Sequence, residues 1–347
     1  MAKYTKLGNT GLRVSNPILG FMSYGSPTWS SWVKPAEEAL PIIKAAYDMG
    51  VTTWDTANAY SCGVSEKIVA LALKEYKIPR NEIVIMTKCF FPVEPEGTAQ
   101  DMDLTVTRAR ANSMGLSRAA IFNQVEASLA RLQTDYIDVL QIHRYDYNVS
   151  PEEVMCALND LVRSGKVRYI GASSMYTYQF ATLQHTAEKN GWTKFVSMQN
   201  HYNILYREEE REMIPFCKQT GVGIIPWSPL AQGGVCRPVK KDGETAELTE
   251  REKAYQVRKG PRIPRLQDVP SNQVVISRVE EIAKKHGWSM SEVALAWING
   301  KVSSPIIGAN SIARLEEAIS ASYKSLTDEE IKYLEEPYLP SHVIGNF

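Results

Sequence analysis

The chain has 347 residues, of which 44% are apolar and 22% are charged. This composition is sufficient for a large buried core and excludes wholesale disorder. The 39 Lys and Arg residues balance 39 Asp and Glu residues, so the formal charge is zero. A general nucleic-acid binder or a protein held electrostatically on a membrane needs a basic excess. We therefore expect no nucleic-acid partner and no membrane association.

The chain also has no signal for insertion into a membrane or for export. No run approaches the ~18 consecutive apolar residues of a spanning helix, and the start, MAKYTKLGNTGLRVS, has no apolar stretch of signal-peptide length. The five cysteines are an odd number and form no CxxC pair. Free thiols suit a reducing compartment, so we predict a cytoplasmic protein.

In chain order, the first feature is a short polar segment that turns at Asn9-Thr10-Gly11 and predicts a β-hairpin. Short apolar runs then alternate with amphipathic segments. The predicted strands are 17–22, 51–57, 83–88, 136–143, 167–172, 195–200, 222–227 and 304–308. The predicted helices are 35–49, 65–76, 117–132, a helix from Pro151 that ends at Gly165, 177–190, 207–220, 289–300 and 311–322.

Two of these helices carry clear start signals. Ser150 is the expected N-cap of the helix after strand 136–143, with Pro151 at the first helical position and Glu153 completing a capping box. Ser289 and Glu292 form a second box of the same kind.

Eight apolar runs joined by helices predict a parallel sheet, and eight such units close naturally into a (β/α)₈ TIM barrel. An open doubly wound sheet is the alternative, but no GxGxxG motif occurs. We predict one domain over residues 1–347, with the N-terminal hairpin plugging one mouth. Residues 89–116 and 228–270 exceed ordinary loop lengths, which leaves functional lids and disorder as equal readings.

Four polar side chains fall where a barrel places its chemistry, at the carboxyl ends of neighbouring strands. Asp55, Lys88 and His143 end successive strands, and Tyr60 follows Asp55 in the next loop. A phenol has a pKa near ~10, and an adjacent ammonium lowers it toward the working range. We expect Lys88 to act on Tyr60 in this way, Asp55 to hold Lys88, and His143 to donate to a substrate oxygen.

Taken singly, each of these residues has an ordinary structural explanation, and it is their joint occurrence that favours chemistry. A proton donor beside a polar clamp suits reduction of a carbonyl by a hydride cofactor, since no side chain supplies a hydride. A Schiff-base lyase using Lys88 as nucleophile is an alternative. The five histidines show no HxH or HExxH spacing, so we predict no metal site.

The motifs Asp55-Thr-Ala-Asn-Ala-Tyr60, IVIMTK ending at Lys88 and DVLQIH ending at His143 resemble those of the aldo-keto reductases. The resemblance continues through GASS, QNHYN, WSPLAQGG and PIIGANS, and is greatest to fungal aryl-alcohol dehydrogenases and versiconal hemiacetal acetate reductases. It implies metal-free reduction of carbonyls to alcohols with NADPH, with Tyr60 as general acid, Asp55 and Lys88 tuning it and His143 orienting the carbonyl. Potassium-channel β-subunits of the same family use the barrel as a partner module, which leaves a regulatory role as the alternative.

The resemblance also implies a nicotinamide cofactor site. Asp55, Ser173, Ser174 and Gln199 would surround the nicotinamide, on which Trp227 would stack in place of the usual tyrosine. Relatives usually have Ser-Asn where this chain has Ser173-Ser174. The pyrophosphate-contacting positions are Ser228, Pro229, Leu230 and Gln232.

The adenosine end of that site is expected around the last strand. Gly308 and Ser311 precede a helix whose N-terminal amides favour a phosphate. Arg314 would pair with the 2′-phosphate and Glu317 with the adenine. Many relatives have a basic residue near 308–310 and Asn at the position of Ala318, so NADPH is favoured over NADH mainly through Arg314.

Aromatic residues flank the expected mouth and suggest a small, flat or aromatic carbonyl or alcohol as the substrate, with loop packing as the alternative reading. The expected substrate-binding residues are Tyr24, Trp29, Trp32, Phe90 and Tyr145. The sequence leaves the oligomeric state open.

Overall fold

The computed structural model describes residues 1–99, 104–239, 249–257 and 265–346, and every predicted site residue lies in these ranges. A parallel eight-stranded sheet runs in the order β10-β3-β4-β5-β6-β7-β8-β9. The bounds are β3 Ile18–Gly20, β4 Thr53–Asp55, β5 Val84–Cys89, β6 Ile137–Ile142, β7 Val167–Ser173, β8 Ser197–Gln199, β9 Gly223–Ile224 and β10 Ile306–Ile307.

Backbone hydrogen bonds close this sheet between its two ends. The Ser303 amide donates to the Ile224 carbonyl at 2.9 Å, and the Ile306 amide donates to the Pro226 carbonyl at 2.9 Å. The predicted (β/α)₈ barrel is confirmed. The last two strands are shorter than predicted, because Pro226 and Pro305 have no amide hydrogen to donate to a ladder.

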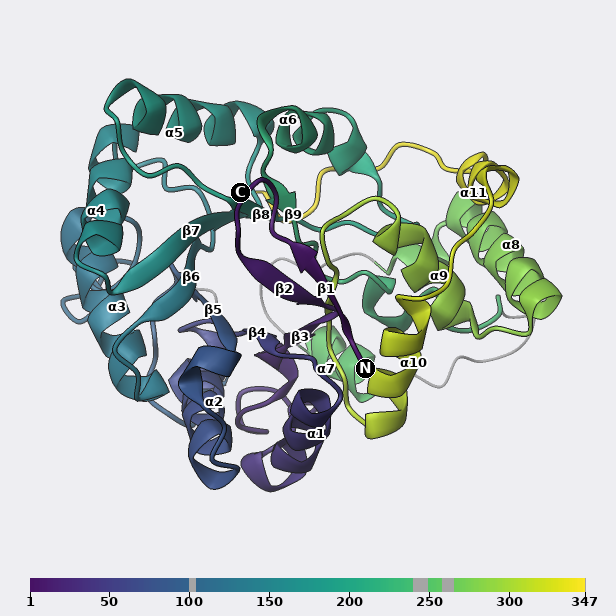
Figure 1. Cartoon of the computed structure of the whole chain (residues 1–347), viewed down its shortest axis with the longest axis horizontal. Helices are drawn as coiled ribbons and strands as arrows, with labels where there is room; N and C mark the ends of the chain where they lie inside the picture. Colours follow the sequence, from purple (N-terminus) through teal and green to yellow (C-terminus); the bar gives the residue numbers. More distant parts are fainter. Residues whose placement is uncertain (100–103, 240–248, 258–264, 347) are drawn as a thin grey trace.

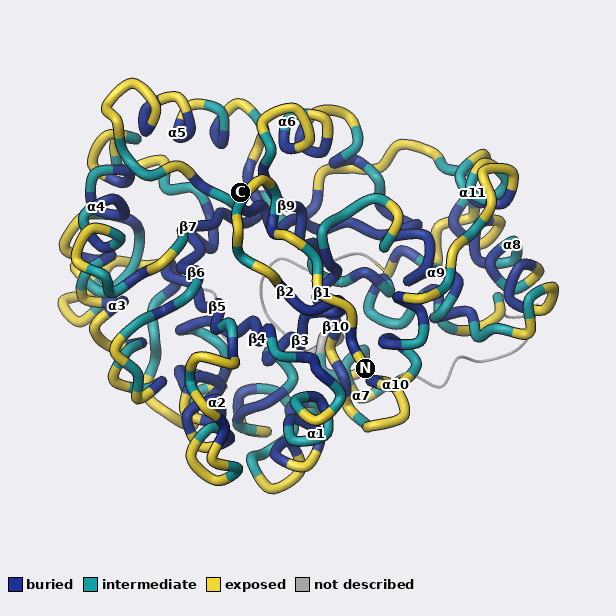
Figure 2. The backbone as a smooth tube through the Cα atoms, in the orientation of Figure 1, coloured by how far each residue is buried: buried dark blue, intermediate teal, exposed yellow. Residues whose placement is uncertain are grey.

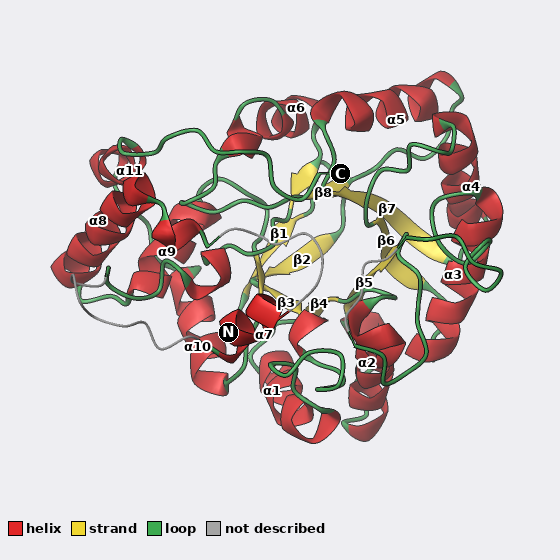
Figure 3. Ribbon diagram, turned by 180° about the vertical axis from the view of Figure 1, so that it is seen from behind, coloured by secondary structure: helices red, strands yellow, loops and turns green. Residues whose placement is uncertain are grey.

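Helices cover the outside of the barrel (Figures 1 and 3). They are α1 Ala36–Asp48, α2 Val64–Glu75, α3 Arg118–Leu132, α4 Pro151–Arg163, α5 Thr177–Lys189, α6 Met213–Thr220 and α10 Ile312–Ala321. Their inner faces are buried and their outer faces exposed (Figure 2). The predicted helix 207–220 begins later, at Met213, because a 3₁₀ turn over Glu208–Glu210 precedes it.

The capping box predicted at Ser289 is confirmed, whereas only the Ser150 half of the box predicted at the start of α4 forms. Ser289 and Glu292 form the complete reciprocal capping box. Ser150 accepts from the Glu153 amide, and Pro151 is the first helical residue. The Glu153 carboxylate, however, accepts from the Arg118 amide at 2.8 Å and so links α4 to the start of α3.

The connection from β9 to β10 is a set of helices rather than one loop. It contains α7 Glu250–Val257, α8 Pro270–His286 and α9 Met290–Asn299, and α11 Asp328–Glu335 packs against α8 (Figure 1). The predicted long segment 228–270 lies partly outside the described residues, at 240–248 and 258–264, and the segment 89–116 does so at 100–103.

The N-terminal hairpin lies across one end of the barrel, as predicted (Figure 1). β1 Lys3–Lys6 and β2 Arg13–Asn16 pair in antiparallel register. Leu7 and Val14 join an apolar cluster inside the barrel with Ile18, Met86, Val139, Ile225 and Ile306. This cluster fills the floor, so the polar residues of the barrel interior lie toward the other end. Among the described helices, none has both the length and the apolar character needed to cross a lipid bilayer.

Candidate active site

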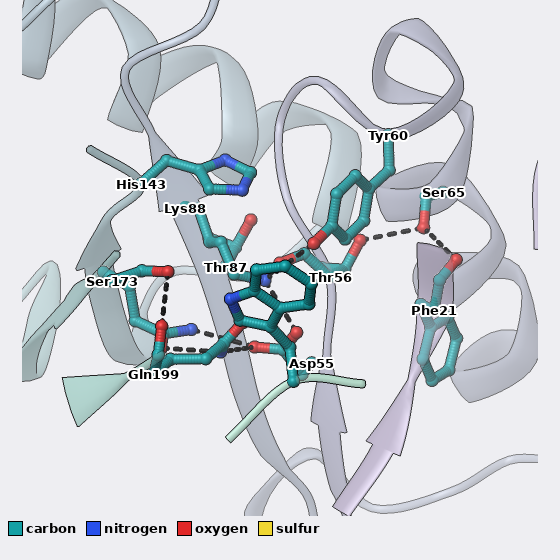
Figure 4. A network of polar contacts seen from close by, with 12 residues as sticks. Phe21, Asp55, Thr56, Tyr60, Ser65, Thr87, Lys88, His143, Ser173 and Gln199 are labelled. Atoms are coloured by element: carbon teal, nitrogen blue, oxygen red, sulfur yellow. Dashed lines mark hydrogen bonds and ion pairs between the residues drawn. The ribbon is translucent and has the colours of Figure 1, made fainter. Parts of the chain in front are cut away.

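A buried lysine connects the predicted catalytic residues. Lys88 Nζ donates to Asp55 Oδ2 at 2.6 Å, to the Thr56 carbonyl at 2.9 Å and to Tyr60 Oη at 3.2 Å (Figure 4). These contacts follow from the fold, because β4, β5 and β6 are neighbours and end at the same mouth. All three donor hydrogens of the ammonium are therefore directed at oxygen.

His143 stands on the other side of Tyr60. The two rings meet edge to face with their centres 5.9 Å apart, and the Phe91 ring contacts the imidazole at 5.0 Å. The imidazole is buried, and its Nδ1 has no hydrogen-bond partner among the described residues. One nitrogen of the His143 imidazole therefore makes no hydrogen bond to the described part of the protein, beside the Tyr60 phenol.

Burial sets the protonation of these groups. Burial raises the pKa of Tyr60 above its usual value, and this effect outweighs the charge and hydrogen bond of Lys88, which lower it. The net direction is opposite to the one expected from the ammonium alone, because the phenolate is desolvated as well as paired. Burial, with the charges of Arg144 and Lys88, holds the pKa of His143 well below its usual value. The site therefore presents a protonated phenol and a neutral imidazole at neutral pH.

Lys88 itself stays charged. Burial alone would lower the pKa of Lys88, but the charges and hydrogen bonds of Asp55 and Tyr60 raise it above its ordinary value. A permanently charged ammonium next to the phenol is thus maintained by the carboxylate behind it.

The turn that carries Tyr60 has an uncommon backbone. Ser61 and Cys62 adopt left-handed conformations with φ of 49° and 55°, and Gly63 follows at 85°. A Cβ at Gly63 would come within 2.6 Å of Arg131 Cδ, whose guanidinium pairs with the buried Glu66. Such backbone strain concentrates at functional sites, and here it follows directly after Tyr60.

A cavity of about 760 Å³ opens beside the phenol. Asp55 and Tyr60 line it together with many of the residues predicted to bind cofactor, namely Gln199, Trp227, Ser228, Pro229, Leu230, Gln232, Gly308 and Arg314. Ser228 and Gln232 have positive φ values of 57° and 58°. The predicted cofactor residues thus share one cavity with the phenol although they come from four strand ends.

The sequence profile described as the Aldo/keto reductase family matches residues 18–338. The chain belongs to the aldo/keto reductase family. It is 54% identical to an aldo-keto reductase of Metarhizium robertsii, an alignment covering 99% of this chain and 93% of that protein. It is 49% identical to the versiconal hemiacetal acetate reductase of Aspergillus parasiticus, with 98% of each chain covered. It is 52% identical to a putative aryl-alcohol dehydrogenase of Schizosaccharomyces pombe, covering 99% of this chain and 97% of that protein.

Four residues predicted to bind cofactor in this aldo-keto reductase lie outside the described lining of the cavity, and their side chains have partners in the protein. Ser173 Oγ donates to the Gln199 carbonyl at 2.7 Å (Figure 4), and Ser174 Oγ accepts from Trp227 Nε1 at 3.1 Å. Ser311 Oγ caps α10 by accepting from the Arg314 amide, and Glu317 accepts from the Ser289 hydroxyl.

The residues predicted to bind substrate divide into two groups. Trp32 lines the cavity, and Tyr145 is half-buried on the loop after β6. Trp29 and Phe90 are buried. Tyr24 is 0% exposed and donates from its hydroxyl to the Ala309 carbonyl at 2.7 Å. A 3₁₀ turn over Phe21–Ser23 directs Tyr24 into the protein, so in this structure its side chain packs in the interior and does not line the cavity.

Two amide side chains beneath the site complete the network. Gln141 Nε2 and Gln199 Nε2 both donate to Asp55 Oδ1 at 2.9 Å, and Gln199 also donates to Gln141 Oε1 at 2.9 Å. Gln141 was not predicted. It lies two residues before His143 on β6, and the alternation of side chains along a strand is the signal that would have found it. Asp55 is thereby held by three donors, which fixes the position of Lys88.

Arg144 was also missed. It follows His143, is buried, and donates from Nη1 to the His143 carbonyl at 2.6 Å. Its charge lowers the pKa of Tyr60, so it adds a second cation near the phenol.

Proposed function

We propose that this aldo-keto reductase reduces aldehydes or ketones to alcohols with NADPH, that Tyr60 is the general acid, and that a single barrel domain carries the activity. The observation that carries the proposal is the position of Lys88 Nζ, 2.6 Å from Asp55 and 3.2 Å from Tyr60, two residues that line the cavity. The Lys88 ammonium stabilises the phenolate that forms when Tyr60 donates its proton, so Tyr60 can act as a buried general acid.

The donor set in the cavity suits a dinucleotide. Trp227 offers a flat ring near Tyr60, and the loop from Ser228 to Gln232 offers left-handed backbone amides of the kind that surround phosphate groups. Gly308, Ser311 and the N-terminus of the ten-residue helix α10 favour an anion at the far end. We propose that Asp55, Ser173, Ser174 and Gln199 surround the nicotinamide ring. When bound, NADPH supplies the hydride that no side chain can.

The residues of the chain then have separate tasks. The neutral His143 donates a hydrogen bond to the substrate carbonyl oxygen and orients it. Tyr60 transfers the proton from Oη to that oxygen as the bond order of the carbonyl falls. The phenolate that remains lies beside the Lys88 ammonium, which stabilises it. Asp55 keeps that ammonium in place, with Gln141 and Gln199 supporting the carboxylate.

Arg314 supports NADPH over NADH. Its side chain lines the cavity and projects from the first turn of α10. A guanidinium pairs well with the two charges of a 2′-phosphate. We place the adenine near Glu317, which the Ser289 hydroxyl holds on the same helix face.

The names of relatives and the aromatic lining favour an aromatic carbonyl substrate. Relatives are named aryl-alcohol dehydrogenases and a versiconal hemiacetal acetate reductase. Trp32 lines the cavity, while Phe90, Phe91 and Tyr145 lie on the loops that follow Lys88 and His143. We propose that Trp32 and Tyr145 present flat apolar surfaces to a substrate whose carbonyl is at Tyr60, whereas Phe90 and Phe91 are buried.

The test is a panel of aromatic and aliphatic aldehydes and ketones, followed by loss of NADPH absorbance, with NADH in parallel and with Tyr60→Phe as the variant. We expect turnover of several aromatic aldehydes by the wild type, and a fall of roughly 10³-fold in kcat for Tyr60→Phe with NADPH binding retained. Slow turnover of every carbonyl with tight NADPH binding would favour the regulatory alternative. Full turnover by Tyr60→Phe would overturn the acid assignment.

A further inference from the structure

Behind the wall of the cavity, three aromatic rings form a stack. The His201 imidazole lies 4.2 Å from the Trp227 indole with 8° between their planes, and 4.5 Å from the Tyr206 ring with 14° between planes. His201 follows β8 and Trp227 follows β9, and the two residues form a parallel bridge between those strand extensions. The ring order Trp227–His201–Tyr206 therefore runs from the cavity into the protein.

Trp227 is held on its edge as well as on its face. Its Nε1 donates to Ser174 Oγ at 3.1 Å, and its backbone amide donates to the Asn200 carbonyl at 3.0 Å. Its indole lines the cavity while the His201 ring is buried behind it. The imidazole thus covers one face of the indole, and the remaining surface of the indole meets the cavity.

Hydrogen bonding does not explain why an imidazole occupies this position. Asn203 Nδ2 donates to the Ser228 carbonyl and contacts His201 Nε2 at 3.1 Å, so Nε2 is the accepting nitrogen. The proton is then on Nδ1, which has no hydrogen-bond partner among the described residues. Burial lowers the pKa of His201 to about 3, so the ring is neutral wherever the protein is folded and active. A buried N–H without a partner is unfavourable, and what the residue contributes in return is a flat surface.

The third ring, Tyr206, is held by the C-terminal segment. Tyr206 Oη accepts from the Ile344 amide at 2.8 Å, and the backbones of Tyr206 and Asn203 bond to each other at 3.0 and 3.2 Å. Gly345 follows, and a Cβ there would lie 3.3 Å from Trp227 Cζ2. The C-terminal segment thus lies against both end rings of the stack, Tyr206 and Trp227.

We propose that His201 is a positioning residue that holds the Trp227 indole in the plane needed to receive the nicotinamide ring. This inference rests on the proposed function, because it takes Trp227 as the surface on which the cofactor stacks. His201 acts through Trp227 and touches neither cofactor nor substrate. Its neutral flat ring, rather than its hydrogen bond, is the property that matters.

The experiment compares His201→Leu with His201→Phe in the full-length protein. Leucine keeps an apolar side chain but removes the flat ring, whereas phenylalanine keeps the ring and removes the contact with Asn203. KM for NADPH, kcat at saturating NADPH and its pH profile are measured for both, together with the thermal midpoint as a check of folding. We expect His201→Leu to raise KM for NADPH about tenfold with kcat and the pH profile nearly unchanged, and His201→Phe to stay within about threefold of wild type.

Tyr206→Leu and Tyr206→Phe test the same idea at the ring farthest from the cavity, should the larger side chain of His201→Phe disturb folding. We expect the Leu variant to weaken NADPH binding and the Phe variant, which keeps the ring and loses the bond to Ile344, to preserve it. Equal losses in His201→Leu and His201→Phe would overturn the proposal in favour of the Asn203 contact. Wild-type behaviour in both Leu variants would overturn it altogether.

Trp227→Leu separates this inference from the function on which it rests. A rise in KM for NADPH in Trp227→Leu without one in His201→Leu refutes the role of His201 and leaves the cofactor placement intact. An unchanged KM in Trp227→Leu refutes the stacking of nicotinamide on Trp227, and the role of His201 falls with it.

Discussion

Lys88 and Asp55 form a buried ion pair of 2.6 Å, with side chains that are 0% and 3% exposed. Removing two charges from water is costly, and breaking such a pair leaves one charge buried without its partner. The pair is therefore a poor choice for stability alone. We infer that it is retained because the ammonium is needed 3.2 Å from Tyr60.

The first prediction separates these two costs. Lys88→Met leaves the Asp55 carboxylate buried without its cation and should lower the free energy of unfolding by about 3–5 kcal/mol. The double variant Lys88→Met, Asp55→Asn should recover much of that loss, because no net charge is left buried. Neither protein should reduce aldehydes at a measurable rate. Urea unfolding and NADPH consumption are measured on the same preparations, and a double variant as unstable as the single one would contradict the argument.

The second prediction concerns cofactor choice. Arg314→Gln should raise KM for NADPH by about tenfold or more and leave KM for NADH nearly unchanged, since only NADPH carries the 2′-phosphate. Arg163→Gln, the same change at an exposed residue that ends α4, is the matched control. Similar changes in both KM values would place Arg314 away from the 2′-phosphate.

The third prediction is a pH dependence of stability. Burial, with the charge of Glu208, raises the pKa of Glu209 to about 7 although Asn200 donates to it. Because the folded-state pKa is above the unfolded one, the stabilising contribution is complete below about pH 4.5 and is lost as pH rises through 7.

Glu209→Gln has no such titration and keeps an oxygen that accepts from Asn200. Its free energy of unfolding should therefore gain on that of the wild type by up to about 3 kcal/mol between pH 5 and pH 8. Urea melts at four pH values measure the difference, with Glu316→Gln, exposed on α10, as the control. If the free energies of unfolding of the wild type and of Glu209→Gln change in parallel with pH, the prediction is wrong.

The fourth prediction tests the hairpin. Gly8 has a φ of +57°, and a Cβ there would lie 2.3 Å from the Gly221 carbonyl oxygen and 2.5 Å from the Gly223 amide nitrogen. Because both obstacles are backbone atoms, Gly8→Ala should cost about 3 kcal/mol or more. Gly11→Ala, in the same hairpin, meets nothing within 4 Å and should be nearly neutral. Equal thermal midpoints for Gly8→Ala and Gly11→Ala would show that the hairpin does not pack closely against the backbone at Gly221 and Gly223.

The sequence was sufficient for the barrel and for the order of its strands, because each strand is an apolar run bounded by turn residues. It also placed Asp55, Lys88 and His143 at one mouth, since three neighbouring strands end on them. It did not reveal α8, although Pro270 at its start and Gly287 at its end are ordinary boundary signals. That helix lies between the long segment 228–270 and the predicted helix 289–300, a stretch to which no element was assigned.

The site was predicted less completely, for two physical reasons. The position of Gln141 at the site follows from the alternation of side chains along β6, which was not applied to it, and His201 lies just beyond β8 among other polar residues, so it did not stand out from its neighbours. The direction of a side chain after a strand depends on the local turn, which is why Tyr24 was placed at the mouth although it turns inward to Ala309. The pKa of Tyr60 was expected to fall because a sequence shows its cation but not its burial.

The packing of Leu7 and Val14 in the apolar cluster at the floor of the barrel has a consequence for how ligands enter and leave. Because apolar side chains fill that end, the nucleotide and the carbonyl compound of the proposed function would both enter at the opposite end of the barrel. The ligand that lies deeper must arrive first and depart last. Product-inhibition patterns would reveal which of the two that is.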